Sequence, residues 1–363
     1  QTGVGPRYCP SIESKVMTFR DKKRHQLFLE PEFADGESIY LQGFSTAMEE
    51  DMQIKMVHSL KGMEHAEFLK YAYAIEYDAL VPTQYDLTLR VKKYKGLYGA
   101  GQICGTSGYE EAAGLGLIAG INAALYIQGK EPFILKRNES YIGVMIDDLV
   151  SKGTEEPYRL LSSRAEYRLL LRHDNADSRL TPYGYKLGLI SDDRYCLFKD
   201  KYLKIANIIK ILESCLISNK NGLKNLFEEK GIEYTGVGFK GIEILKRPEF
   251  SYMEIAPLIE ELRDQRVSDD EILCIEAQVK YEGYIKKEIK DADNLLKQEE
   301  TLLPIDIDYS TVDGLRLEAR QKLNMVKPRN IGQASRIPGV NPADIAILLM
   351  RLRHGGKLWP LMT

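Results

Sequence analysis

Several common features are scarce or missing in this sequence of 363 residues. Its five cysteines are an odd number, with no C-x-x-C pair and no secretory signal ahead of them, which favours a reduced, cytosolic compartment. No apolar run reaches the roughly 20 residues that a transmembrane helix needs, so no membrane span is expected. Lys and Arg number 50 against 53 Asp and Glu, so nucleic acid could bind only at local basic patches. No residue pattern predicts a metal site.

A complete dinucleotide-binding fingerprint, G-x-G-x-x-G, is also absent. The nearest stretch, residues 99–108, has the spacing G-x-G-x-x-x-G and lies between a strand candidate at 97–100 and a helix candidate at 109–128. Glycines let a backbone approach a ligand closely, and the first amides of a helix attract negative charge. Two interpretations stay open: a cofactor-binding turn, or a plain connection between a strand and a helix.

Up to about Pro132 the sequence alternates short β-type runs, glycine-rich turns and one long helix, which is typical of an α/β layer. Further strands are expected at residues 26–30 and 71–77. After Ile142 helical periodicity dominates, with an amphipathic, solvated helix at 271–300 and a linker at 304–308 before a last helical unit at 312–353. The chain opens on Gln1 without a strand before it, which we interpret as an interior start.

The N-terminal segment places Cys9 two residues from Arg7 and beside Pro10. A nearby cation lowers the pKa of a thiol and so raises its thiolate fraction, which a nucleophile needs. A buried structural cysteine is the alternative. Residues 1–25 hold six Lys or Arg against two Asp or Glu, so this run could contact phosphates or form a solvated face.

Two basic regions lie in the helical half. Arg164, Arg168 and Arg172 recur every four residues, which predicts three guanidinium groups on one helix face that grip phosphates, or that instead pair with neighbouring acids. Residues 311–363 contain nine Lys or Arg and three Asp or Glu. Within this region, residues 337–344 predict a turn into a helix capped by Asn341, either a phosphate-touching turn of helix-hairpin-helix type or a simple helix corner.

Seven motifs together resemble the MnmG (GidA) family in order and spacing. They are residues 5–13 (GPRYCPSIE), 25–32 (HQLFLEPE), 73–78 (YAIEYD), 105–113 (GTSGYEEAA), 163–169 (SRAEYRL), 281–285 (YEGYI) and 332–337 (GQASRI). They run along nearly the whole chain. The resemblance implies the C-terminal half of such a protein: an α/β remnant of an FAD-binding, Rossmann-like domain at 1–135, a helical domain at 136–303 and a small helical domain at 304–363.

The resemblance also implies an activity. Members of this family install a carboxymethylaminomethyl or aminomethyl group on carbon five of the wobble uridine of transfer RNA (tRNA). FAD, NADH and methylenetetrahydrofolate take part, with a partner GTPase of the MnmE type and a homodimeric assembly. Lacking the first dinucleotide fold, a chain of this extent is expected to bind FAD weakly or not at all.

Site residues follow from the same resemblance. Cys9 is the implied catalytic nucleophile, which would add to carbon six of uracil. The implied FAD contact is Gln102, with the neighbouring Gly101, Gly105, Thr106, Gly108, Tyr109 and Glu110. The implied nicotinamide-dinucleotide segment contains Gly5, Pro6, Arg7, Tyr8, Pro10, Ser11, Ile12, Glu13, Lys15 and Phe19. The predicted RNA contacts are Arg164, Arg168, Arg172 and Arg336.

Three other functions are weighed against this one. A folate- and FAD-dependent tRNA uridine methyltransferase shares the flavin motifs but lacks a long helical extension. A module that only binds tRNA and the GTPase would need no chemistry of its own. A general flavin oxidoreductase without an RNA substrate leaves the basic C-terminal region without a use.

Overall fold

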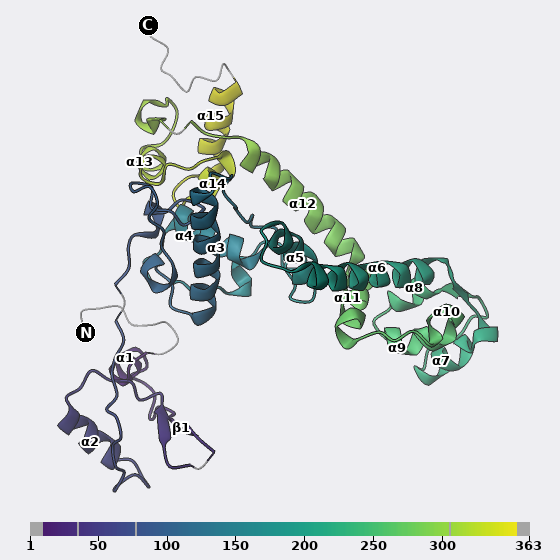
Figure 1. The fold of residues 1–363 in the computed structure, drawn as a ribbon, viewed down its shortest axis with the longest axis horizontal. Helices are drawn as coiled ribbons and strands as arrows, with labels where there is room; N and C mark the ends of the chain where they lie inside the picture. Colours follow the sequence, from purple (N-terminus) through teal and green to yellow (C-terminus); the bar gives the residue numbers. More distant parts are fainter. Residues whose placement is uncertain (1–9, 35, 77, 305, 354–363) are drawn as a thin grey trace.

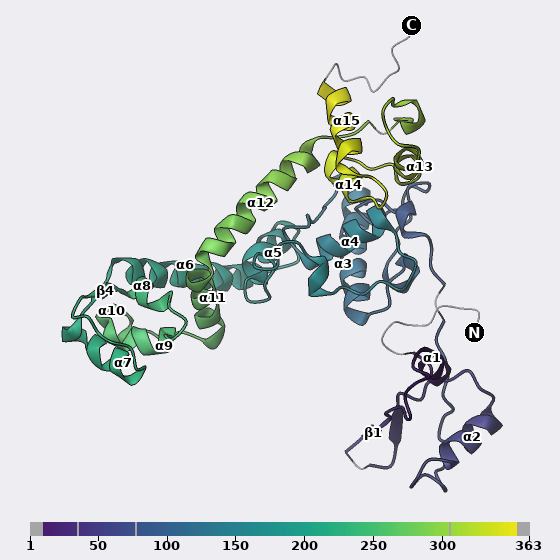
Figure 2. The same ribbon diagram turned by 180° about the vertical axis from the view of Figure 1, so that it is seen from behind.

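The structure is a computed structural model that describes residues 10–34, 36–76, 78–304 and 306–353. It divides into an N-terminal lobe (residues 10–71), a central block (82–172), a helical arm (176–280) and a C-terminal bundle (306–353) (Figure 1). In Figures 1 and 2 the arm extends away from the central block, and helix α12 (Glu282–Glu300) runs back from the arm to the bundle.

The N-terminal lobe holds α1 (Ile12–Thr18), β1 (Phe28–Pro31), β2 (Ile39–Gln42) and α2 (Glu50–His58). The two strands form an antiparallel hairpin in which Phe28 pairs with Gln42, and nearly all of their residues are exposed. Both views show this lobe as a separate body, joined to the central block by extended chain (Figures 1 and 2). Its fold therefore depends on few buried side chains.

Only the first of the three expected strands is present. The prediction at 26–30 overlaps β1, but residues 71–76 are extended without a partner strand, and 97–100 contribute only one isolated bridge, between Tyr98 and Arg90. A strand needs a continuous run of backbone hydrogen bonds with a neighbour. Residues 97–100 share only two such bonds with residues 89–91, and residues 71–76 share none with other described residues. The predictions at 71–77 and 97–100 were wrong.

The central block packs two helices, α3 (Tyr109–Ile127) and α4 (Tyr141–Lys152), around one apolar core, with short 3-10 helices η1 (Pro82–Gln84), η2 (Gly101–Cys104) and η3 (Ser162–Arg164) beside them. The predicted helix at 109–128 matches α3 within one residue. Leu115 and Ile118 of α3 and Met145 and Leu149 of α4 are almost fully buried in that core. Residues before and after position 135 contribute to this one core. The domain boundaries at 135/136 and 303/304 stay a prediction.

The helical arm has a core of its own. Its elements are α5 (Ala176–Lys186), α6 (Asp192–Ser214), β3 (Leu216–Ile217), η4 (Asn219–Asn221), α7 (Leu223–Glu229), β4 (Phe239–Lys240), α8 (Gly241–Leu245), α9 (Tyr252–Ile255), η5 (Ala256–Leu258), α10 (Glu260–Arg263) and α11 (Asp269–Lys280). The helix expected at 271–300 is broken at Tyr281 into α11 and α12. Helix α11 buries Cys274, Ile275 and Val279, whereas α12 is mostly solvated.

The C-terminal bundle contains η6 (Tyr309–Thr311), α13 (Leu317–Val326), α14 (Ile331–Arg336) and α15 (Pro342–Arg353). The predicted cap is confirmed, because Oδ1 of Asn341 accepts a hydrogen bond from the amide of Asp344 at 2.9 Å. Pro342 is the first residue of α15, as expected. The mainly helical second part of the fold is likewise confirmed. In the described ranges no helix combines the length and the apolar character that a bilayer crossing requires.

Candidate functional site

The glycine-rich loop at residues 101–108 begins with η2 and ends at the residue before α3. Gly101 and Gly105 have φ angles of +76° and +86°, which side chains disfavour. The amide of Tyr158 donates to the carbonyl of Gly105 at 2.8 Å, and Ser107 donates to Tyr158 at 3.2 Å. A fixed backbone here positions the first amides of α3.

Glu111, in the first turn of α3, links the end of this loop to residues 159 and 160. Its buried carboxylate accepts hydrogen bonds from Nε of Arg159 at 3.1 Å and from the amide of Leu160 at 2.7 Å. A Cβ atom on Gly108 would lie 1.8 Å from Oε2 of Glu111. Only glycine fits at position 108 while Glu111 keeps these partners.

Three buried polar atoms at the loop lack a hydrogen-bond partner in the described residues. They are Oγ1 of Thr106, Oγ of Ser107 and Oε2 of Glu111. Buried polar atoms are almost always paired, so three such atoms within six residues favour a polar ligand or ordered water at this place.

Gln102 and the first two residues of α3 face outward. Gln102 is exposed, as are Tyr109, at 94% of its surface, and Glu110. Cys104, in contrast, is buried, and burial raises the pKa of its thiol to about 11. Cys104 is therefore a neutral, structural thiol.

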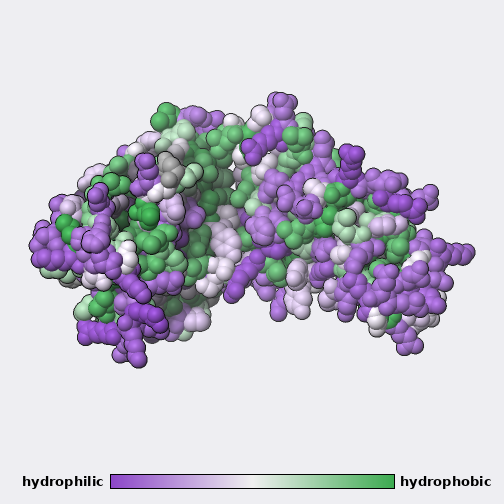
Figure 3. Space-filling view, turned by 90° about the horizontal axis from the view of Figure 1, so that it is seen from below, coloured by the Kyte–Doolittle hydropathy of each residue, from purple (hydrophilic) through white to green (hydrophobic). Residues whose placement is uncertain are grey.

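Beyond Glu110, the outward face of α3 is largely apolar. The exposed residues of the helix are Tyr109, Glu110, Ala113, Gly116, Leu117, Gly120, Ala124, Tyr126 and Ile127. A Cβ atom on either of the two glycines would meet nothing within 4 Å. Seen from below, apolar side chains gather in the half of the molecule that holds the central block and the N-terminal lobe, whereas the arm is mostly polar (Figure 3). The loop thus borders an open surface.

Helix α1, which follows the implied nucleophile in the sequence, lies in a different lobe from this loop (Figures 1 and 2). Gly5, Pro6, Arg7, Tyr8 and Cys9, the implied catalytic residue among them, lie outside the described residues.

The rest of the N-terminal segment is tied to residues 43–47. The amide of Ile12 donates to the carbonyl of Ser45 at 2.7 Å, and Nζ of Lys15 donates to that of Gly43 at 2.7 Å. Burial opposes ionisation of Glu13, but hydrogen bonds from Thr46 and Ala47 lower its pKa overall. Pro10 and Ser11 precede α1, and Phe19 follows it with half of its surface exposed.

The three arginines spaced by four residues do not share a helix. Only Arg164 lies in a 3-10 turn, and no helix continues to Arg172. The amides of Leu169 and Leu170 donate instead to Glu288 of α12, both at 3.1 Å. A carboxylate from a distant helix thus takes the amides that a local helix would have used, and the predicted shared face was wrong.

Each of these arginines has its own surroundings. Arg164 lies over the ring of Tyr158, 4.3 Å from its centroid. Arg172 pairs with Asp174 at 2.9 Å, whereas Arg168 is exposed. Arg168 is thus the member of the three with the most accessible side chain.

Arg336 belongs to a buried ionic junction that sequence analysis missed. Its guanidinium bonds Asp147 at 2.7 and 2.9 Å and Glu299 of α12 at 3.0 Å, with 10% of the side chain exposed. Burial raises the pKa of Glu299 against the pull of Arg336. The junction joins the bundle, α12 and α4.

Arg137 completes this junction on the other side of Asp147. Its guanidinium contacts Asp147, Asp148 and Glu166 at 3.1, 2.8 and 2.7 Å, with 2% of the side chain exposed. Arg137 follows no motif in the sequence, and only the paired acids at 147 and 148 on an otherwise apolar helix could have signalled a buried cation.

Comparisons with known proteins cover most of the chain. Residues 1–131 match the family model of glucose inhibited division protein A. Residues 192–289 and 291–358 match the C-terminal helical domain and the C-terminal helical bundle of the tRNA modifying enzyme MnmG/GidA.

Among similar proteins are two named tRNA uridine 5-carboxymethylaminomethyl modification enzyme MnmG. The one from Clostridium botulinum (strain Loch Maree) is 52% identical over 355 residues, which are 98% of this chain and 56% of the relative. The one from Streptococcus sanguinis is 53% identical over 96% of this chain and 55% of its own length. The chain therefore spans a little over half the length of these relatives.

The fold of this chain is also similar to a solved structure. GidA of Aquifex aeolicus in its form II crystal superposes with a TM-score of 0.79 at 44% identity, over 95% of this chain and 55% of that one. Its form I crystal gives a TM-score of 0.77. Since the family models, the relatives and the solved fold agree along nearly the whole sequence, the chain belongs to the MnmG (GidA) family.

Proposed function

We propose that this chain is part of a flavoenzyme that adds a carboxymethylaminomethyl or aminomethyl group to carbon five of the wobble uridine of tRNA. The observation that carries this proposal is the membership of the family, together with relatives that are named for this modification. The long helical arm supports it over the folate-dependent methyltransferase, whose flavin domain lacks such an extension.

FAD is the proposed cofactor, with NADH as reductant and methylenetetrahydrofolate as the source of the one-carbon unit. When bound, the flavin supplies reversible two-electron transfer. The residues of the loop fit a polar ring edge, since they offer the exposed Gln102, the glycine backbone at Gly101 and Gly105, and the unpaired hydroxyl of Thr106. Gly108, Tyr109 and Glu110 would line the start of α3 beside it.

Cys9 is proposed as the nucleophile, in the nicotinamide-dinucleotide segment that continues through Ser11, Ile12 and Glu13. Its thiolate would add to carbon six of the uracil and make carbon five nucleophilic toward the one-carbon unit. Arg7, two residues away, supports a lowered thiol pKa. In an active enzyme, Cys9→Ser is expected to reduce the rate of wobble modification at least about 100-fold; an unchanged rate would refute the role.

Transfer RNA is the proposed substrate, with an MnmE-type GTPase as partner and a homodimer as the assembly. Arg168 is the best placed of the predicted contacts because its side chain is exposed. Arg164, Arg172 and Arg336 already have partners, so any contribution from them to RNA binding would compete with those contacts.

Binding of tRNA to the 363-residue chain tests the RNA part of the proposal. An electrophoretic shift at 50 mM salt should weaken at least about tenfold at 200 mM, because phosphate contacts release counterions. Arg168→Ala should weaken binding about three- to tenfold. The control is Lys224→Ala on the far part of the arm, where an exposed lysine pairs with Glu228 one turn away. The proposal would be contradicted if the affinity for tRNA changed neither with salt concentration nor with Arg168→Ala.

A further inference from the structure

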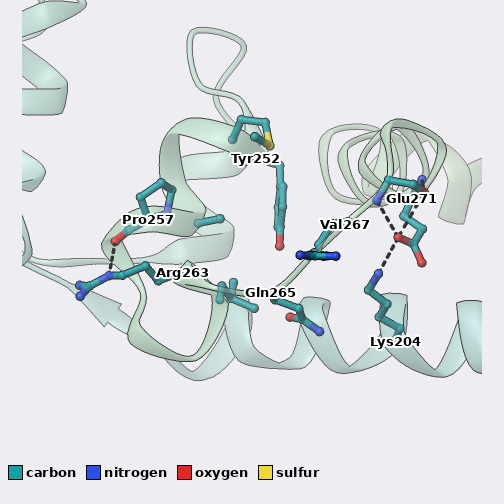
Figure 4. A pocket seen from close by; sticks show the side chains of 12 residues that line it. Lys204, Tyr252, Pro257, Arg263, Gln265, Val267 and Glu271 are labelled. Atoms are coloured by element: carbon teal, nitrogen blue, oxygen red, sulfur yellow. Dashed lines mark hydrogen bonds and ion pairs between the residues drawn. The ribbon is translucent and has the colours of Figure 1, made fainter.

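A pocket of about 590 Å³ opens on the helical arm, far from the loop at 101–108. It lies between α9, the segment 262–268 and α6, which contributes Lys204 (Figure 4). Its volume is within the range of small-molecule sites. Nothing in the function proposed above uses it.

Cations dominate the ionisable groups that line this pocket. Lys204, Arg263 and Arg266 face one carboxylate, Glu271. One oxygen of that carboxylate, Oε2, already accepts hydrogen bonds from Nζ of Lys204 at 2.7 Å and from the amide of Ser268 at 2.8 Å. Nε of Arg263 donates a hydrogen bond to the carbonyl of Pro257 at 3.2 Å, and the side chains of Arg263 and Arg266 are both exposed. Arg263 is directed to Pro257 and away from Tyr252 (Figure 4), so the guanidinium of Arg266 is the one that remains available to an anion in the pocket.

Two unpaired polar atoms point to a ligand independently of these charges. The side chain of Tyr252 is 2% exposed, and its hydroxyl has no hydrogen-bond partner among the residues described. Oε1 of Gln265 is likewise buried and unpaired in the described chain. Figure 4 shows both side chains at the pocket, with the ring of Tyr252 directed into it. A buried hydroxyl and a buried amide oxygen both call for partners with N–H or O–H groups.

Apolar side chains form the remaining wall. Met253, Pro257, Leu262 and Val267 line the pocket beside the ring of Tyr252. Such a wall suits a flat ring, which buries apolar area while its edge makes hydrogen bonds. The pocket thus combines an anion-binding end, a flat apolar wall and two polar groups for a ring edge.

The surroundings limit the size of the anion. Acidic residues adjoin the arginines in sequence, at Glu260, Glu261, Asp264, Asp269 and Asp270, and all are exposed. They would repel a long polyanion that lay across the surface. A single phosphate that enters the pocket avoids them.

We propose that this pocket binds one nucleotide, with its phosphate on Arg266, its base against Pro257, and N–H groups of the base on Oε1 of Gln265 and the hydroxyl of Tyr252. The nucleotide is either a free nucleoside monophosphate or a terminal nucleotide of an RNA. The proposal does not depend on the modification activity.

Calorimetric titration of the whole chain with AMP, UMP, adenosine and inorganic phosphate tests this site. A nucleoside monophosphate should bind at least about tenfold more tightly than adenosine, which lacks the charge. Arg266→Gln should weaken its binding about tenfold, and Tyr252→Phe, which keeps the ring, about three- to fivefold. Lys210→Gln, an exposed lysine on the same helix as Lys204, is the matched control and should change nothing.

A short oligoribonucleotide with a terminal phosphate then separates the two sources. Competition with the mononucleotide identifies an RNA end as ligand, and lack of competition identifies the free nucleotide. The proposal is overturned if no mononucleotide binds at millimolar concentration, or if Arg266→Gln and Tyr252→Phe both bind like the parent. Loss of this binding leaves the contact of tRNA with Arg168 unaffected, so the two proposals fail separately.

Discussion

The ionic junction and the pocket of the arm both gather arginines, but they use them differently. At the junction, Arg137 and Arg336 are nearly buried and contact carboxylates on two sides. At the pocket, Arg263 and Arg266 are exposed, and the nearby carboxylate of Glu271 already has other partners. An arginine is therefore available to a ligand only where no carboxylate of the protein pairs with it, and counts of charge along the sequence do not reveal this pairing.

Removing Arg137 should break the junction and have the largest effect. Arg137→Met would leave Asp147 and Asp148 buried with less compensation, since both side chains are at most 6% exposed. Breaking a buried network by removing one partner costs about 3–5 kcal/mol. Urea unfolding followed by circular dichroism would measure this loss in the free energy of unfolding.

An exposed arginine supplies the control for that experiment. Arg168→Met changes the same side chain at an exposed position and should stay within about 0.5 kcal/mol of the parent. Equal unfolding midpoints for the two variants would show that the buried junction adds no more to the free energy of unfolding than an exposed arginine does. The proposed difference between buried and exposed arginines would then be refuted.

Local signals in the sequence predicted the start of two helices well. The glycines before Tyr109 and the small residues after it gave α3 to within one residue, and Asn341 with Pro342 gave the start of α15. Both depend on neighbours in sequence, which a pattern can represent.

Features that depend on distant partners were not predictable. Arg164 and Arg172 have helical spacing, yet Glu288, more than a hundred residues away, takes the amides between them. The unpaired hydroxyl of Tyr252 likewise depends on what packs around α9 and not on its neighbours in sequence. A tyrosine in an apolar context looks the same in sequence whether or not its hydroxyl is paired.

Two glycines near the start of α3, Gly108 and Gly116, also differ in whether neighbouring groups crowd them. At Gly108 a methyl group would collide with Oε2 of Glu111 at 1.8 Å, and the buried carboxylate would have to leave Arg159 or Leu160. Gly108→Ala should therefore cost about 1–3 kcal/mol, the penalty for unpaired buried polar groups. Gly116, two turns along α3, has open space around it.

Gly116→Ala should stabilise the chain by about 0.5–1 kcal/mol, since alanine favours a helix interior over glycine. Thermal unfolding of both variants should thus shift in opposite directions from the parent. If Gly108→Ala proved as stable as the parent, Glu111 would be free to move, and its unpaired oxygen would be no sign of a ligand. If Gly116→Ala proved destabilising instead, the outward face of α3 would be covered in solution, for example by a second copy of the chain, and a second measurement of the variant's molecular mass would show whether that contact was lost.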